Sequence, residues 1–368
     1  MTKHKRLELL DCIRAAAILM IIAYHVAIEF PPEKLDAVWS WLAKYGFLGV
    51  DVFFPLSGFL ITLFLSRNHD PAGIKVFFTR RMFRIIPIYL IAVGCYFVVA
   101  EALNREPGIE TAWINLLFLT GWVILIEGKA NVPFTITWSL SVEEFAYILC
   151  GLSFLFLRSR APIALVVLSV GSVLVRAAAL HYGLPKNEVY SFPLARLDSV
   201  FLGALTALGV LYMNKRTLLV TLLAFLCVQL LVAQTSTLAF RVALYPSVAT
   251  AVCLIIVVIW TYFHSFSSLA SRFFAAIGAL AYFMYLFHYF FLYGIQMVAQ
   301  KIDVDLSPTG LMAMTTALTW LAAYVSWTKF ELPLIEYGRS LETRFKKQTN
   351  NGAETTSSSS GRTGRSKS

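Results

Sequence analysis

Long apolar runs separated by short polar segments dominate the chain. A helix needs about 20 mostly apolar residues to cross the hydrocarbon core of a membrane. Runs near this length occur at residues 9–29, 47–66, 83–101, 139–157, 162–181, 193–212, 217–234, 246–264, 277–299 and 308–330. The pattern predicts an all-α integral membrane protein with about ten transmembrane helices.

An eleventh apolar run, near 112–127, is shorter and contains Asn115 and Glu127. Loops rich in Lys and Arg usually face the cytoplasm. If this run crossed the membrane, the basic turn 158–160 would face the exterior. If it re-enters or lies in the interface, that turn and the basic tail both face the cytoplasm. We therefore expect a short re-entrant or interfacial segment here and two cytoplasmic termini.

The composition agrees with a multi-pass protein. Hydrophobic residues make up 58% of the chain and charged residues 14%, with a mean hydropathy of +0.70, whereas soluble domains carry about 25% charged residues. The net charge of +10 is spread over short loops and the tail, which argues against nucleic-acid binding. The five cysteines lie inside apolar runs without metal-ligand spacing, so we expect no metal site.

The two parts of the chain differ sharply in composition. Residues 1–338 are expected to form one transmembrane domain. Residues 339–368 are rich in Ser, Lys and Arg, which predicts a disordered basic cytoplasmic tail that associates with anionic lipid. The first apolar run follows a basic segment but has no small-residue cleavage site, so a retained membrane anchor is favoured over a signal peptide.

Ionisable residues inside the predicted spans are the first candidates for function, because they are costly there. Arg14 and His25 are eleven residues apart, which places both on one helix face about 16 Å apart along the axis. Arg14 would lie toward the cytoplasm and His25 toward the exterior. The structural alternatives are that Arg14 pairs with Asp11 and that His25 is a hydrogen-bonded interior residue.

The second predicted span begins with Asp51 and continues through Pro55 to Ser57 and Gly58. Asp51 lies at a depth similar to that of His25 and is a candidate to fix its tautomer. A Pro and a Gly loosen the helix and let its backbone approach a ligand or a neighbour. A packing kink with Asp51 as a helix-start carboxylate is the structural alternative.

Two further clusters open the third and fourth predicted spans. Arg81 and Arg84 lie one helical turn apart and form a donor cluster suited to phosphates, or a plain positively charged flank. Trp138 and Ser139 precede Glu143, which either complements the helix dipole or holds a substrate hydroxyl. Weaker polar positions follow in later spans, where a structural hydrogen bond is favoured, at Arg196, Asp198 and His288.

These residues form an ordered set of motifs that extends over nearly the whole chain apart from the tail. The motifs are Leu9-Leu10-Asp11-x-x-Arg14 with ten residues before His25, Phe53-Phe54-x-x-Ser57-Gly58, Arg81-x-x-Arg84-x-x-Pro87, Trp138-Ser139-Leu140-x-x-Glu143, Arg196-x-Asp198 leading to Gly203, Tyr285-Leu286-Phe287-His288, and Glu331-x-Pro333. The set resembles the membrane-bound acyltransferase type 3 family, which includes O-antigen acetylases and nodulation-factor acetylases.

The resemblance implies a core of ten spans in the bacterial cytoplasmic (inner) membrane. It implies an O-acyltransferase that moves an acyl group, usually acetyl, from cytoplasmic acyl-CoA to a hydroxyl of a cell-surface carbohydrate or lipid-linked glycan. Acyl-CoA is then a co-substrate, and no tightly bound cofactor is expected. The acceptor, the acyl chain, a covalent acyl-serine step and the oligomeric state stay open at this point.

The roles expected under this resemblance are divided between the two faces of the membrane. Arg14, Arg81 and Arg84 bind the CoA phosphates and the pantetheine arm. His25 removes the acceptor proton, and Asp51 or Glu143 orients His25 or the acceptor. The expected substrate path and channel comprise Ser57, Gly58, Trp138, Ser139, Arg196, Asp198 and His288.

A different class of function fits the same composition. In a polytopic transporter or flippase for a glycan or small solute, intramembrane Arg, His and Glu act as gates or proton relays. Transporters often contain inverted repeats with paired broken helices, and no such repeat is evident in the sequence. The enzyme is therefore the favoured interpretation.

Overall fold

The computed structural model describes residues 2–68, 70–263 and 268–340, with side chains from residue 8 onward. Every regular element in these residues is a helix, and they contain no strand, which confirms the predicted all-α class. From residue 341 onward the predicted tail lies outside the described residues.

The long helices follow the predicted apolar runs. They are α1 Thr2–Ala27, α3 Gly49–Leu65, α4 Pro71–Ala102, α7 Trp138–Leu152, α8 Ala161–His181, α10 Leu197–Tyr212, α11 Lys215–Ala233, α12 Thr237–Tyr262, α14 Ala281–Lys301 and α15 Pro308–Ser326. Shorter helices lie between them, namely α2 Ala37–Tyr45, α5 Ala112–Leu116, α6 Thr120–Glu127, α9 Lys186–Ser191 and α13 Leu269–Ala279. Short π-helical segments extend α7 over Ser153–Leu157 and α15 over Trp327–Glu331.

Polar caps mark where several helices begin. The side chain of Asp70 accepts a hydrogen bond from the Gly73 amide, and Pro71 occupies the first helical position of α4. Ser236 and Ser307 cap α12 and α15 in the same way. These side chains satisfy amides that have no partner within the helix, so the sequence itself specifies where these three helices start.

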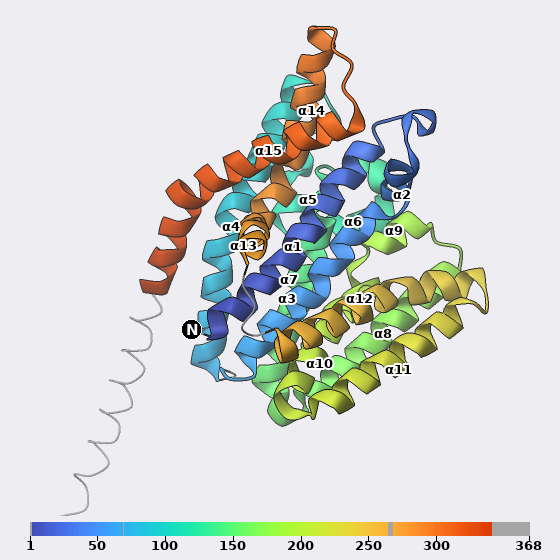
Figure 1. Cartoon of the computed structure of the whole chain (residues 1–368), viewed down its shortest axis with the longest axis vertical. Helices are drawn as coiled ribbons and strands as arrows, with labels where there is room; N and C mark the ends of the chain where they lie inside the picture. Colours follow the sequence, from blue (N-terminus) through green and yellow to red (C-terminus); the bar gives the residue numbers. More distant parts are fainter. Residues whose placement is uncertain (1, 69, 264–267, 341–368) are drawn as a thin grey trace, which may run out of the picture.

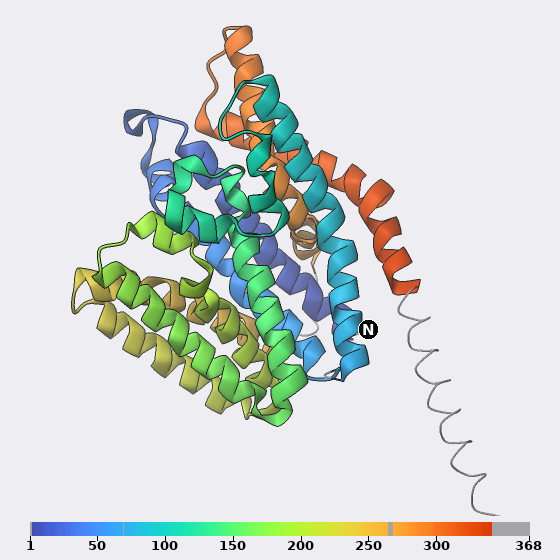
Figure 2. The ribbon, with the colours of Figure 1, turned by 180° about the vertical axis from the view of Figure 1, so that it is seen from behind.

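The helices are long and apolar enough for a multi-pass membrane protein. Six in the described part of the chain meet the length and hydropathy that a crossing needs, or seven if the bent pair α13–α14 is one span. One of the six, Thr135–His181, contains both α7 and α8, which meet at a turn (Figure 2). The predicted count of ten and the cytoplasmic location of both termini stay predictions.

Two predicted segments differ from continuous spans. The run 277–299 corresponds to α14 for most of its length, and its first residues belong to α13, which meets α14 at an angle of 69°. The run near 112–127 forms α5 and α6, of 5 and 8 residues, joined at Phe118 with a positive φ of 56°. Each of these helices is shorter than the roughly 20 residues of a crossing.

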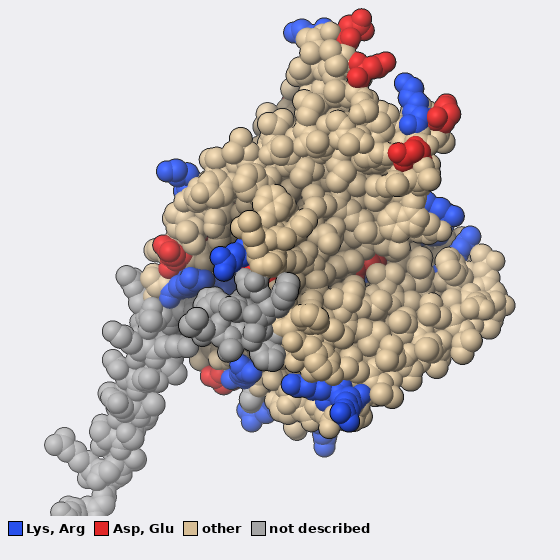
Figure 3. All heavy atoms as spheres, in the orientation of Figure 1, with Lys and Arg blue, Asp and Glu red and all other residues tan. Residues whose placement is uncertain are grey.

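The charged side chains on the surface are unevenly distributed along the molecule. In Figure 3 most Lys, Arg, Asp and Glu side chains lie toward the upper and lower ends, and the broad region between them contains few charged side chains. Such a region is what a lipid-facing surface requires. The first described residues of α1 and the end of α15 lie at the same end of the molecule, as both ribbon views show (Figures 1 and 2).

Helices α1 and α3 lie at the centre and position the polar residues. α1 packs against α3, α13, α14 and α15, and α3 packs most extensively against α10. Helices α8, α10, α11 and α12 form a bundle on one side of this centre (Figure 1). The short elements α2, α6 and α9 lie near the end of the molecule where α1 finishes (Figure 1). Of these three, α2 packs against α1.

Candidate active site

Two cavities lie on successive stretches of α1. The first, which we call the arginine pocket, has a volume of about 120 Å³ and is lined by Arg14, Arg81 and Arg84 among others. The second, the tyrosine pocket, has about 540 Å³ and contains His25 in its lining. Val50 and Tyr285 line both. The two cavities therefore share a wall, and α1 carries a basic residue into each of them.

Glu143 is fixed inside the arginine pocket. Its Oε1 accepts a hydrogen bond from Ser57 Oγ at 2.8 Å, and its Oε2 accepts one from Tyr147 Oη at 2.6 Å. The guanidinium of Arg81 lies 3.8 Å from the centre of the Tyr147 ring. This cation–π contact and the nearby carboxylate hold Arg81 in place. α3, α4 and α7 thus all contribute polar side chains to the pocket.

Arg14 both forms an ion pair and lines the same pocket. Its guanidinium forms an ion pair with Asp11, one turn earlier on α1, as one of the two interpretations of the sequence predicted. It also lines the cavity beside Arg84 of α4. The pairing leaves Arg14 part of the pocket wall, so the structural and the ligand-binding interpretations are compatible.

His25 is hydrogen-bonded to a second histidine. Its Nδ1 lies 2.9 Å from Nε2 of His288 on α14. Nδ1 of His288 lies 2.7 Å and 3.2 Å from the carbonyl oxygens of Tyr285 and Met284. Because a carbonyl oxygen only accepts, Nδ1 of His288 carries a proton, and its Nε2 in the neutral ring accepts from His25. Nε2 of His25 is then left with a lone pair, and His25 lines the tyrosine pocket while His288 is buried.

The carboxylates expected to orient His25 have other partners. Asp51 forms a buried ion pair with Arg196, and Oδ2 of Asp51 accepts a hydrogen bond from Tyr190 Oη at 3.2 Å. Burial raises the pKa of Tyr190 well above its ordinary value, so the phenol keeps the proton that it donates. Among the described residues, neither Asp51 nor Glu143 contacts His25. His288 makes that contact.

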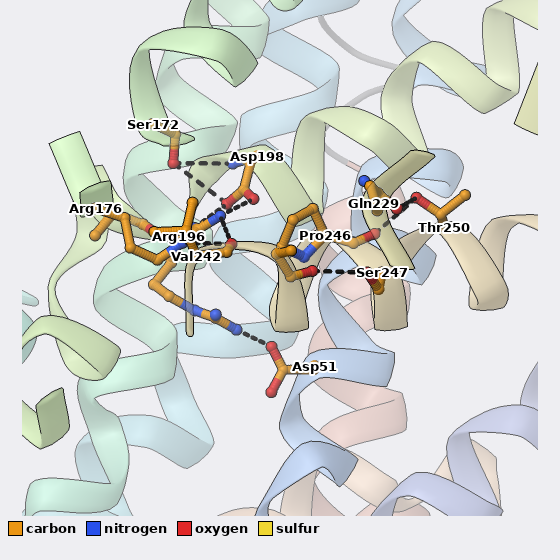
Figure 4. A network of polar contacts seen from close by, with 12 residues as sticks. Asp51, Ser172, Arg176, Arg196, Asp198, Gln229, Val242, Pro246, Ser247 and Thr250 are labelled. Carbon is orange, nitrogen blue, oxygen red and sulfur yellow. Dashed lines mark hydrogen bonds and ion pairs between the residues drawn. The ribbon is translucent and has the colours of Figure 1, made fainter. Parts of the chain in front are cut away.

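Asp198 belongs to a second buried ion pair (Figure 4), whose arginine, Arg176, lines the tyrosine pocket. Arg176 binds it through two nitrogens, with Nη1–Oδ1 and Nη2–Oδ2 distances of 3.0 and 2.8 Å. Ser172 Oγ donates to the same carboxylate, and Arg176 Nε donates to the Val242 carbonyl. Such pairs are costly to break because each would leave an unpaired buried charge. They fix α8, α10 and α12 relative to one another.

Of the remaining predicted residues, some line the pockets and one serves the packing of helices. Ser139 Oγ donates to Tyr285 Oη at 2.8 Å, at the wall between the two pockets. Trp138 lines the tyrosine pocket, with its ring 4.7 Å from that of Tyr190. Gly58 lines neither cavity; a Cβ there would lie 1.8 Å from the Val200 carbonyl oxygen of α10. Its role is close helix packing.

Several site residues were not predicted from the sequence. Arg176 lies in the middle of an apolar run, and the rule that intramembrane charges are functional would have identified it. Tyr147, Tyr190 and Tyr245 gave no comparable signal, because tyrosines are common throughout such a chain. The described residues contain no group of three or more His, Cys, Asp or Glu side chains that could hold a metal ion.

A family model described as "Acyltransferase domain" matches residues 7–329. The chain belongs to this acyltransferase family. The match includes every residue of the two pockets that is discussed above. No solved structure matches the acyltransferase chain significantly.

Curated relatives of the acyltransferase are bacterial. A Staphylococcus aureus protein named "Putative O-acetyltransferase" is 29% identical over 56% of this chain and 36% of its own length. A Listeria monocytogenes protein named a peptidoglycan O-acetyltransferase is 30% identical over 40% of this chain and 24% of its own length. A Bacillus subtilis protein named "Putative peptidoglycan O-acetyltransferase" is 27% identical over 56% and 33%. The alignments thus span about a third or less of each relative.

Proposed function

We propose that this acyltransferase moves an acyl group, with acetyl as the first candidate, from cytoplasmic acyl-CoA to a hydroxyl of a cell-envelope carbohydrate or lipid-linked glycan. The observation that carries the proposal is the pair of adjoining pockets, with arginines in one and a histidine base in the other. The names of the relatives support acetyl as the group and an envelope glycan as the acceptor. On this proposal the protein lies in the bacterial inner membrane.

The arginine pocket suits the donor. Guanidinium groups bind phosphate through two parallel hydrogen bonds and stay charged at all physiological pH values. Arg81 and Arg84 lie on one face of α4, and Arg14 faces them from α1. The phosphates of acyl-CoA would occupy this pocket, and the pantetheine arm would extend along α1 toward His25.

The step itself needs one base and no cofactor. Nε2 of His25 removes the proton of the acceptor hydroxyl while the oxygen attacks the thioester carbonyl carbon. The C–S bond then breaks, an ester forms, and His25 returns the proton to the sulfur, which leaves as the CoA thiol. His288 accepts the Nδ1–H bond of His25 throughout and so stabilises the positive charge that develops on that ring.

The wall between the pockets must let the thioester pass. Val50 and Tyr285 border both cavities, and Tyr285 is held by Ser139 and by the Ile136 carbonyl, which accepts from Tyr285 Oη at 2.6 Å. Rotation of this single side chain would join the two cavities. A side chain held by two hydrogen bonds costs about 1–3 kcal/mol to release, which the binding of acyl-CoA can supply.

The transporter alternative finds less support. Transporters of this kind pair two broken helices across a repeat, and one bent pair, α13–α14, occurs in the described part of the chain. The bend lies beside the arginine pocket, which Gly278 and Ala281 line. A bend at this position can shape a donor-binding site equally well, so it does not favour a translocation path.

The decisive experiment removes the base. His25→Ala, purified in membranes and supplied with labelled acetyl-CoA and envelope glycan, should lose acyl transfer by a factor of about 10²–10⁴. His181→Ala is the matched control, because His181 is exposed at the end of α8. Transfer by His25→Ala at the rate of the control would overturn the proposal. Movement of unmodified glycan would instead indicate a transporter.

A further inference from the structure

The rim of the tyrosine pocket is basic. Five cationic side chains line the cavity, and no Asp or Glu is among its lining residues; the cations are Lys44, Lys129, Arg176, Lys186 and Arg241. Arg176 is neutralised by its two hydrogen bonds to Asp198. The other four are exposed, and we call them the cationic rim. None of them forms an ion pair with another residue that the structure describes.

The cationic rim is assembled from four separate segments. Lys44 lies in the last turn of α2, Lys129 follows α6, Lys186 begins α9 and Arg241 lies in the first turns of α12. A single basic segment would be explained by its local sequence. Local sequence does not explain why four separate segments each place a cation at one cavity, because these segments meet there only in the folded chain.

The expected topology makes this cluster more unusual. Loops on the outer face of a membrane protein carry few Lys and Arg, because positive residues are retained inside. The tyrosine pocket lies on the half of α1 that is expected to face outward. Four cations at the mouth of an outward-facing cavity therefore oppose the expected orientation of the chain. A function in ligand binding would explain why they are there.

One carboxylate is close to the rim. Glu188 lies near enough to Lys129 for their charges to interact. Lys129 also lies near enough to His25 for their charges to interact. The lining itself thus carries cations and no carboxylate, and one of these cations lies beside the proposed base.

The walls of the cavity suit a sugar. Tyr24, Tyr245 and Tyr289 line it with Trp138, and aromatic side chains present an apolar face together with a polar edge. The Tyr289 ring lies 4.5 Å from the ring of His25. At about 540 Å³ the cavity falls in the range of about 300–1,000 Å³ that holds small ligands.

We propose that the tyrosine pocket binds a carbohydrate acceptor that carries a negative charge, a phosphate or a carboxylate, bound by the cationic rim while its hydroxyl lies at His25. This inference rests on the proposed function and names the acceptor class of that same site. A positive entrance raises the local concentration and the association rate of an anionic substrate by about 10–10³ at low salt. The acceptor is then selected by charge before its hydroxyl reaches the base.

The first test identifies the charge of the product. Glycans from cells that express the acyltransferase or His25→Ala are separated by anion exchange, and acyl esters are counted in each fraction. Enzyme-dependent esters should lie in the retained, anionic fraction. Phosphatase treatment removes the retention of a phosphorylated glycan, whereas blocking carboxylates with a carbodiimide removes that of an acidic sugar. Esters in the unretained, neutral fraction would overturn the inference while leaving the acyl-transfer function intact. Absence of any enzyme-dependent ester would refute the proposed function itself.

The second test removes charge from the rim. Lys186→Gln/Arg241→Gln should raise KM for the retained glycan about three- to tenfold, with KM for acetyl-CoA unchanged. Lys186→Arg/Arg241→Lys keeps the charges and should restore the original KM, which a purely structural role would not predict. Lys215→Gln/Arg216→Gln, exposed at the start of α11, is the matched control. An unchanged KM in the first double variant would overturn the inference.

Discussion

At the scale of single residues, the contact between two histidines determines which nitrogen of His25 can act. The carbonyl oxygens of Tyr285 and Met284 fix the proton of His288 on Nδ1, and that in turn directs the Nδ1 proton of His25 toward His288. A base is efficient when its tautomer is set in advance, because no population is lost to the inactive form. His288 is a positioning residue in this arrangement, since it is buried and lines neither pocket.

Replacing His288 should separate positioning from packing. We expect His288→Ala to lower kcat by about tenfold or more with KM for acetyl-CoA unchanged, because the Nδ1 proton of His25 loses its acceptor. His288→Gln offers a carbonyl oxygen to the same proton and should retain more activity than His288→Ala. Steady-state kinetics of the two variants, at matched amounts of inserted protein, make the comparison. Equal loss in both would assign His288 a purely structural role.

Most residues of the ordered polar motifs line the two pockets or lie beside them, but their partners could not be read from the sequence. Asp51 and His25 were expected at a similar depth, but a similar depth along the membrane normal does not imply contact. Which neighbour a carboxylate meets depends on how helices rotate and cross. Asp51 is turned toward α10, where Arg196 meets it. Arg176 shows the same limit, because its partner Asp198 is 22 residues away along the chain.

At the scale of helices, two glycines make the close crossing of α3 and α10. Gly58 of α3 lies against the Val200 carbonyl of α10, and Gly203 of α10 lies against the Pro55 carbonyl of α3. A Cβ at these positions would lie 1.8 Å and 2.0 Å from the respective carbonyl oxygens. Small residues at such crossings allow backbones to approach closely. This contact sets the position of Ser57 and therefore of Glu143.

Adding a methyl group at this crossing should destabilise the protein. We expect Gly58→Ala and Gly203→Ala each to lower the free energy of unfolding by about 1–3 kcal/mol, as overpacking does, because backbone has to move to accommodate the Cβ. Gly171→Ala in α8 is the matched control, since nothing lies within 4 Å of a Cβ there, and it should be neutral or stabilising by up to about 1 kcal/mol. Thermal unfolding in detergent compares the three. A midpoint for Gly58→Ala equal to that of the control would show that α3 and α10 can separate freely.

The bounds of a helix could be predicted where hydropathy alone determines them. They were harder to predict where packing against another helix determines them. Apolar runs located α1, α3, α8 and α11 well. The break between α13 and α14 follows no proline; it occurs beside Gly278, which lies against the Asp11 carbonyl of α1. A contact between residues so far apart in sequence leaves no local pattern, so the sequence did not indicate the bend between α13 and α14.

At the scale of the whole molecule, the proposed chemistry depends on sidedness. The arginine pocket lies toward the start of α1 and the tyrosine pocket toward its end, so the two substrates would approach from opposite faces. This holds if the segment 112–127 does not cross the membrane. Two observations favour that topology: α5 and α6 are short, and the basic turn 158–160 then shares a face with the start of α1.

Accessibility of single cysteines tests the topology directly. In a background without native cysteines, we expect Glu110→Cys to react with a membrane-impermeant maleimide on intact cells. Ser159→Cys should react only after the membrane is opened, because both positions are exposed and only the bilayer separates them from the reagent. If Ser159→Cys reacts on intact cells, α8 begins outside and the segment 112–127 crosses. The arginine and tyrosine pockets would still adjoin, but the donor could no longer be assigned to the cytoplasm from the loop charges, and acyl transfer across the membrane would lose its physical basis.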